Sequence, residues 1–177
     1  FEHSGVVPDI VTMSKALGGI GLPISAVAYR ERLNTLPPGL HIGTFRGNAT
    51  AYAAGGAAIG FMIEHDLAGH AASVGQEMLS ELAVLQKESE IAGDVGGAGL
   101  MSGVECGRDR ATKEPAPDLA VSVRSSCHRR GVLVEIGGHY SNVVRFLPPL
   151  VITREMALRG VAVFAESVSE VERSRRV

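Results

Sequence analysis

The residue best suited to chemistry in this sequence is Lys15, which closes an apolar run that begins after Pro8. Glycines follow at Gly18, Gly19 and Gly21, so the backbone beside the lysine leaves room for a bulky ligand. A lysine at the end of a buried strand is desolvated, which favours the neutral, nucleophilic form of its amine. We therefore predict that Lys15 forms a Schiff base with an aldehyde cofactor. The alternative is a surface lysine at a strand end.

A second candidate is Thr44, which lies between Gly43 and Gly47 just before a long apolar stretch. A hydroxyl and a backbone N–H between glycines form a small concavity for an anion, and the dipole of a following helix strengthens it. We predict a phosphate contact at Thr44. The alternative is that Thr44 only caps the helix.

The third candidate is Arg145, which lies between apolar residues just before Pro148 and Pro149. A charge in such a strand needs a partner. A planar guanidinium binds a carboxylate through two parallel hydrogen bonds and so orients a substrate. We predict carboxylate binding by Arg145, and the alternative is a structural ion pair with Glu135 or Glu105. Glu135 could instead face a distal amine of the substrate.

The elements that would position Lys15 and Thr44 lie in the first part of the chain. Residues 9–13 predict a short buried strand, and residues 24–30 predict a second strand. Residues 49–66 are almost all small or apolar, which predicts a helix that is buried or packed against a second helix or subunit. Two short strands and one helix do not complete a buried parallel sheet.

The composition shifts near residues 66–74, and we place a domain boundary there, dividing residues 1–68 from residues 69–177. The second part is predicted to follow the order helix, strand, helix, strand, strand, helix, which makes a complete α+β unit. Its elements are expected at residues 74–88, 100–106, 118–130, 132–135 and 143–146 and after Thr153, with none in the glycine cluster 93–99.

Composition excludes several classes of function. The formal net charge is −2 with no long run of one sign, which argues against binding of nucleic acid or of an anionic membrane surface. The apolar runs are shorter than the ~20 residues that span a membrane. Cys106, Cys127 and the six histidines show no metal-binding spacing, so we expect no metal site and two free thiols in a reduced, cytoplasmic protein.

The order of these segments resembles that of class III aminotransferases, which have the fold-type I architecture and use pyridoxal 5′-phosphate. The variants around Thr44 and Arg145 are most similar to diaminobutyrate–2-oxoglutarate aminotransferases. The implied fold class is α/β, with the C-terminal part of the fold-type I large domain (1–68) followed by a small α+β C-terminal domain (69–177). The matching segments are Phe1-Glu2-His3, Pro8-Asp9-Ile10, Ser14-Lys15, Gly43-Thr44-Phe45, Gly47-Asn48, Arg145 and Pro148-Pro149-Leu150.

The resemblance implies a role for each candidate. Lys15 would hold the cofactor covalently and then transfer a proton between substrate and cofactor, a step worth about 10²–10⁴-fold in rate. Thr44 would contact the phosphate of the cofactor bound by the neighbouring subunit, which implies a homodimer with shared active sites. Arg145 would bind the α-carboxylate of glutamate or 2-oxoglutarate.

The implied reaction moves the terminal amino group between a diamino acid, 2,4-diaminobutyrate, and 2-oxoglutarate or glutamate. Alternatives are other ω-aminotransferases (ornithine, acetylornithine or 4-aminobutyrate), an aminomutase, or a truncated paralogue without catalytic activity. The family's upstream aspartate at the pyridine nitrogen, its phosphate loop and its ring-stacking aromatic residue have no counterpart here. We therefore expect this chain to be the C-terminal portion of the enzyme and to be inactive alone.

Overall fold

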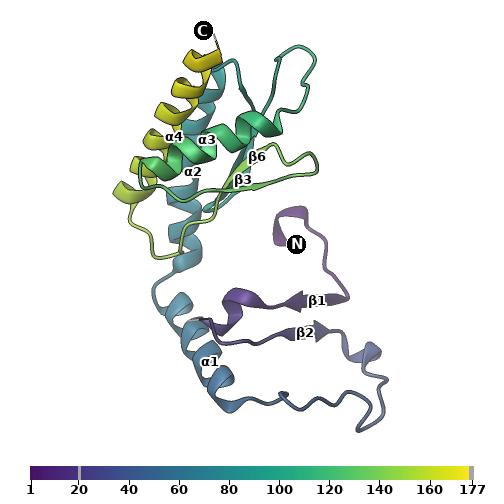
Figure 1. Ribbon diagram of the computed structural model, residues 1–177. Coiled ribbons are helices and arrows are strands. Elements are labelled where there is room, and N and C mark those ends of the chain that lie inside the picture. Colours follow the sequence, from purple (N-terminus) through teal and green to yellow (C-terminus); the bar gives the residue numbers. More distant parts are fainter. Residues whose placement is uncertain (20, 176–177) are drawn as a thin grey trace. The chain divides into compact units, whose positions relative to one another are not determined.

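The computed structural model describes residues 1–19 and 21–175, and the chain divides into two compact units, Phe1–Asp66 and Leu67–Val177 (Figure 1). Each unit has most of its contacts within itself. None of the helices in the described ranges is both long and apolar enough to cross a membrane.

The first unit is a two-stranded antiparallel ribbon joined to one long helix. Strands β1 (Ile10–Met13) and β2 (Ala26–Tyr29) pair with Ile10 opposite Tyr29 and Met13 opposite Ala26. The segment that connects the two strands contains the 3-10 helix η2 (Lys15–Gly18). Helix η2 packs against α1 (Ala49–Glu64). Two further 3-10 turns are η1 (Glu2–Ser4) and η3 (Glu31–Leu33).

Strand β1 is not buried, so the prediction of a buried strand before Lys15 is wrong for this chain. Val11 is half-buried, whereas Ile10, Thr12 and Met13 are exposed. The reason is that a ribbon of two strands has two faces and two edges, and the described part of this unit has no further strand or layer to cover them.

Helix α1 also leaves most of its apolar surface exposed. Its buried residues are Ala51 and Gly55, and a Cβ built on Gly55 would lie 2.9 Å from the Leu17 carbonyl oxygen of η2. These small residues of α1 therefore lie where the helix meets η2. Large apolar side chains that remain exposed on α1 are Tyr52, Ile59, Phe61, Met62 and Ile63.

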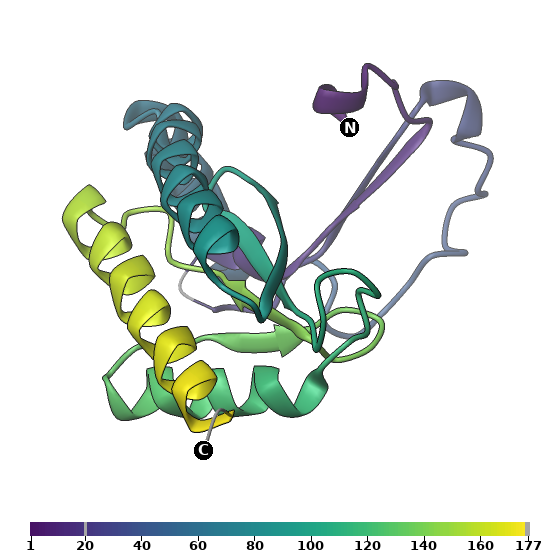
Figure 2. The same cartoon turned by 90° about the horizontal axis from the view of Figure 1, so that it is seen from above.

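The second unit is a four-stranded antiparallel sheet with helices packed on one face (Figure 2). The strand order is β3-β4-β6-β5, and helices α2 and α3 contact the sheet while α4 packs against both helices. The elements are α2 (Leu67–Glu88), β3 (Ala92–Ala98), β4 (Met101–Cys106), α3 (Pro117–Arg129), β5 (Glu135–Gly137), β6 (Val143–Phe146) and α4 (Arg154–Arg175).

The core of this unit lies between the sheet and the helices. Val144 and Phe146 of β6 are buried, and the Phe146 ring meets Phe164 of α4 edge-on at 5.2 Å between centroids. Because side chains alternate along a strand, Arg145 lies between these two residues on the face of the sheet opposite the helices. The strand that carries Arg145 is thus fixed by the core behind it.

Strand β3 was not predicted, because the glycine cluster 93–99 has low β-propensity. The structure pairs this segment with β4, placing Val95 opposite Val104 and Gly96 opposite Gly103. A Cβ built on Gly97 would lie 2.4 Å from the Met101 carbonyl oxygen. Glycine is therefore required by the close approach of the hairpin backbone, and tertiary packing overrides local propensity.

Strand β5 begins later than predicted, at Glu135 instead of residue 132. Helix α3 ends at Arg129, and Gly131 follows with φ +82°, the left-handed conformation of a helix-terminating glycine. The Val132 N–H then donates to the Cys127 carbonyl at 3.0 Å. The backbone at 132 therefore completes the end of the helix and does not join the sheet.

Glu170 of α4 joins the last two helices through a polar cluster. Its carboxylate accepts a hydrogen bond from the buried Ser126 hydroxyl at 2.7 Å and pairs with Arg130 at 2.6 Å and Arg129 at 2.8 Å. These contacts, the Ser126 hydrogen bond first, lower the pKa of Glu170 from its ordinary 4.5 to about 2.

We expect Glu170→Gln to destabilise the protein at neutral pH and to lose that effect in acid. The folded-state pKa lies below the ordinary value, so ionised Glu170 stabilises the fold above about pH 4.5, and this contribution is lost as the pH falls to about 2. Thermal unfolding between pH 7 and pH 2 measures the difference. Glu166→Gln is the control, because its 3.7 Å contact with Arg130 is exposed. A difference in melting temperature between wild type and Glu170→Gln that stays constant with pH would contradict a stabilising role of the ionised Glu170 carboxylate.

Candidate active site

Lys15 occupies a strained backbone position. It is the first residue of η2 and has φ +56°, in the left-handed region that a residue with a side chain adopts at a cost of about 1–2 kcal/mol. The preceding Ser14 hydroxyl donates to the Ile24 carbonyl at 3.1 Å, which joins the two ends of the loop. Strain of this kind persists where the surrounding structure imposes it, and it is concentrated at functional sites.

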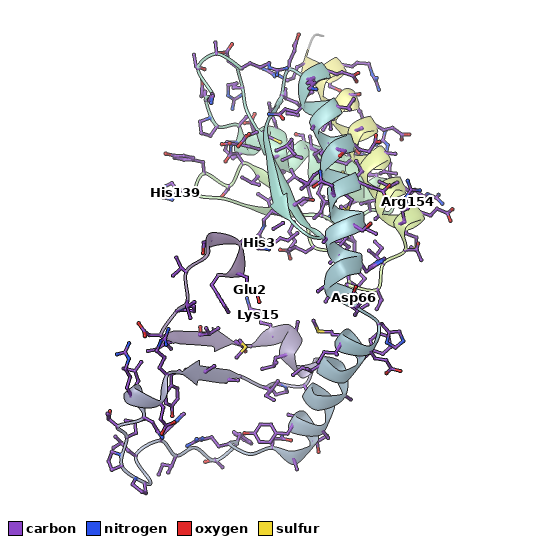
Figure 3. The ribbon with its side chains drawn as sticks, turned by 180° about the vertical axis from the view of Figure 1, so that it is seen from behind. Glu2, His3, Lys15, Asp66, His139 and Arg154 are labelled. Atoms are coloured by element: carbon purple, nitrogen blue, oxygen red, sulfur yellow. The ribbon has the colours of Figure 1, made fainter. Side chains whose placement is uncertain are left out.

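A cavity of about 620 Å³ adjoins Lys15; it is wide open to solvent, and its volume is comparable to that of small-molecule sites. Figure 3 shows Lys15 where the chain leaves β1 and enters η2. The side chain is exposed, so the burial predicted to activate the amine is not provided by this chain, in which β1 itself is exposed. The lining residues are Ser14, Lys15, Ala16, Gly19, Gly21, Leu22, Pro23, Ile24 and Ser25.

Glycines hold the cavity wall against helix α1. Gly19 has φ +66°, and a Cβ built on it would lie 3.0 Å from the Ala58 Cβ of α1. Gly21, with φ +96°, has open space beside it. The cavity therefore combines one primary amine and two serine hydroxyls with a wall formed partly by bare backbone.

Thr44 lies in the turn that precedes α1, and it does not cap the helix. The cap is Asn48, whose Oδ1 accepts a hydrogen bond from the Ala51 N–H at 3.0 Å. The alternative that Thr44 is only a helix cap is therefore excluded. The turn is closed by the Arg46 N–H donating to the Gly43 carbonyl at 3.1 Å, and the Thr44 side chain is exposed.

Thr44 is not among the residues that line the Lys15 cavity in the described part of the chain. A threonine that contacted a ligand at Lys15 of its own chain would be expected to border that cavity. The structure thus places the two candidates in the same unit without bringing them together in one cavity.

Arg145 has a protein partner on the face of the sheet opposite the helices. Its cross-strand neighbour on β5 is Glu135, and Arg145 Nη2 lies 3.1 Å from Glu135 Oε2. Glu105 makes a different contact, accepting a hydrogen bond from Asn142 Nδ2 at 3.0 Å. The side chains of Arg145 and Glu135 are 42% and 68% exposed, and an exposed pair contributes only about 0–1 kcal/mol. The Arg145–Glu135 ion pair is therefore a weak contact on the surface of the sheet.

Analysis of the sequence missed Gly137, which lies beneath the Arg145 guanidinium. A Cβ built on Gly137 would lie 2.5 Å from Arg145 Nε. Only the cross-strand register reveals this contact, because Gly137 and Arg145 are separated by a hairpin.

Among residues 1–19 and 21–175, the structure shows no group of three or more His, Cys, Asp or Glu side chains arranged to hold a metal ion.

Comparison with known proteins gives the family. Residues 1–168 match the family described as aminotransferase class-III. Diaminobutyrate–2-oxoglutarate aminotransferase of Rhizobium meliloti (strain 1021) is 39% identical over 159 residues, which cover 86% of this chain and 34% of that protein. Leucine/methionine racemase of Thermococcus litoralis is 41% identical over 175 residues, which cover 98% of this chain and 39% of that protein.

A solved structure shares the fold as well. An amine transaminase from an uncultivated Pseudomonas species, in its PLP-bound form, superimposes with a TM-score of 0.87 at 28% identity, covering 96% of this chain and 40% of that one. The chain therefore belongs to the class-III aminotransferase family and has the fold-type I architecture of its structural neighbours. It spans little more than a third of the length of the curated relatives named above.

The cofactor of this family is pyridoxal 5′-phosphate, and the Lys15 cavity fits its aldehyde and its ring. The group needs a primary amine to bond its aldehyde, space for its ring, and polar contacts around it. The cavity supplies the Lys15 amine, about 620 Å³ of space and the hydroxyls of Ser14 and Ser25.

Proposed function

We propose that the complete protein is a pyridoxal-phosphate-dependent aminotransferase in which Lys15 bonds the cofactor. The observation that carries the proposal is a strained lysine beside a cavity of about 620 Å³, in a chain of the class-III family. When bound, the cofactor supplies an electron sink for the carbanion formed at the substrate Cα. Lys15 would hold the aldehyde carbon through its amine, with loss of water, until the substrate amine replaced it, and the freed Lys15 amine would then move the proton at Cα.

We propose 2,4-diaminobutyrate as amino donor and 2-oxoglutarate as acceptor. The name of the Rhizobium meliloti relative supports both substrates. Arg145 supports the acceptor, because a guanidinium held only by an exposed ion pair can bind a carboxylate through two hydrogen bonds.

A panel of amino donors tests the substrate in the complete protein. With 2-oxoglutarate as acceptor, we expect glutamate to form fastest from 2,4-diaminobutyrate, and more slowly from ornithine, acetylornithine and 4-aminobutyrate. Glutamate formed from ornithine but not from diaminobutyrate would refute this substrate while leaving the aminotransferase reaction intact.

Amino-acid racemisation is the second candidate, favoured by the 41% identity to the Thermococcus litoralis racemase. It needs the same proton movement at Cα by Lys15, with the proton returned to the opposite face and no acceptor consumed. Loss of optical rotation from L-leucine or L-methionine without any 2-oxo acid, together with no glutamate formed from any donor, would favour the racemase.

We also propose a homodimer in which Thr44 contacts the phosphate of the cofactor bound by the neighbouring subunit. The exposed position of Thr44 outside its own Lys15 cavity supports this, as do the exposed apolar side chains of α1.

The two cysteines are free thiols, which supports a reducing location such as the cytoplasm.

Mixed dimers of Lys15→Ala and Thr44→Ala chains test the shared site. If Thr44 acts across the interface, one of the two sites in each mixed dimer has both an intact lysine and an intact threonine. We expect such dimers, isolated with two different affinity tags, to recover about half of the wild-type activity per dimer, as this site count requires. Activity no higher than the mean of the two parent dimers would place Thr44 in its own subunit's site.

A further inference from the structure

We propose that Gly137 is a positioning residue for Arg145, because its bare backbone is the surface on which the guanidinium lies. The proposal rests on the proposed function, in which Arg145 binds the substrate carboxylate. It adds a residue that neither residue type nor sequence spacing indicates.

The cross-strand register places three residues on one face of the sheet. Glu135 of β5 is opposite Arg145 of β6, and Gly137 is opposite Val143, two residues away on the same side. A Cβ on Gly137 would lie 2.5 Å from Arg145 Nε, 2.6 Å from Cζ and 3.1 Å from Cδ. The guanidinium therefore lies directly over the Gly137 backbone, closer than any side chain would allow.

A second observation shows that packing holds this pose. Arg145 Nε is buried and has no hydrogen-bond partner within residues 1–19 and 21–175, although the side chain as a whole is 42% exposed. A buried donor without a partner is unfavourable, so the pose must be imposed by its neighbours. Glu135 fixes one end of the guanidinium through Nη2, and Gly137 provides the space beneath Nε and Cζ.

The backbone does not require glycine at position 137. Gly138 has φ +82°, whereas Gly137 is not among the residues with positive φ, so an alanine can adopt its conformation. The atoms that an alanine would displace are the far end of a flexible side chain. Gly137→Ala should therefore preserve the fold and move the guanidinium, which separates positioning from stability.

The test measures calorimetric binding of glutarate, a non-reactive dicarboxylate, to the complete cofactor-loaded protein, alongside steady-state kinetics with the acceptor 2-oxoglutarate. Gly137→Ala should raise both the Kd of glutarate and the KM of the acceptor by up to about 10²-fold, the effect of a misplacement near 1 Å, with a smaller change in kcat. Gly96→Ala is the matched control, since Gly96 lies in the same sheet and a Cβ there meets nothing within 4 Å.

The double variant Gly137→Ala/Arg145→Ala identifies the route of the effect. If Gly137 acts through Arg145, the double variant binds glutarate no more weakly than Arg145→Ala alone. Additive losses, or wild-type binding by Gly137→Ala, would overturn the inference. Wild-type binding by Arg145→Ala would instead refute the proposed role of Arg145. If Gly137→Ala does not fold, removal of the Arg145 side chain should restore folding, and failure to do so would also overturn the inference.

Discussion

Lys15→Ala should lower kcat of the complete, cofactor-loaded protein by at least about 10²–10⁴-fold, the contribution of general acid–base catalysis alone. The variant loses both the amine that bonds the cofactor and the base that moves the substrate proton. Alanine retains a Cβ, so the φ of +56° and its strain stay as they are, and the melting temperature of the cofactor-free protein should not change. Steady-state kinetics with thermal unfolding measure both quantities.

Two further variants serve as controls for this result. Lys87→Ala removes an exposed lysine at the end of α2 and should leave kcat unchanged. Lys15→Gly should be as inactive as Lys15→Ala but more stable by about 1–2 kcal/mol, because glycine adopts positive φ without strain. Turnover by Lys15→Ala at the wild-type rate would exclude Lys15 as the catalytic amine.

Gly75→Ala should destabilise the second unit by at least about 3 kcal/mol, the upper end of the usual range for overpacking. Gly75 lies on the buried side of α2, where a Cβ would be 1.9 Å from the Gly99 carbonyl oxygen and 2.2 Å from its carbon. The clash is between two backbone segments. Gly75 belongs to helix α2, and Gly99, with φ +55°, belongs to the tight turn between β3 and β4. Neither can move without separating α2 from the sheet.

The sign of the change in unfolding free energy distinguishes a steric clash from the higher helix propensity of alanine. A glycine-to-alanine change inside a helix normally stabilises it by about 1 kcal/mol. Gly160→Ala in α4 is the control, because a Cβ there meets nothing within 4 Å, and it should show that normal gain. Unfolding in denaturant gives the free energy of both variants. A Gly75→Ala variant as stable as the wild type would contradict the close approach of α2 to the turn.

The helices of the second unit could be predicted in outline because their signals are local. Helix α3 begins with Pro117 and is followed by Gly131 at positive φ, and Thr153 caps α4 by accepting a hydrogen bond from the Met156 N–H at 3.2 Å. Strand β3 could not be predicted, because its stability comes from pairing with β4 and from packing beneath α2. Neither contact leaves a signal in the glycine-rich segment itself.

The candidate residues could be chosen from the sequence by the chemistry of their side chains, but their burial and their partners could not be predicted from it. The types of Lys15 and Arg145 and their neighbours in sequence are sufficient to suggest an amine and a guanidinium that act on a ligand. Sequence left open whether Arg145 pairs with Glu135 or Glu105, because that choice depends on strand register. Burial of Lys15 was predicted wrongly, because exposure depends on which strands and layers cover β1.

Borohydride trapping shows directly whether Lys15 bonds the cofactor. Sodium borohydride adds hydride to the carbon–nitrogen double bond between cofactor and lysine, leaving a stable secondary amine that proteolysis and mass spectrometry can locate. The sequence has three lysines, Lys15, Lys87 and Lys113. The phosphopyridoxyl mass should appear on the peptide that contains Lys15 and on no peptide that contains a different lysine. Labelling of a different lysine in the complete protein, with the Lys15 peptide unmodified, would contradict it.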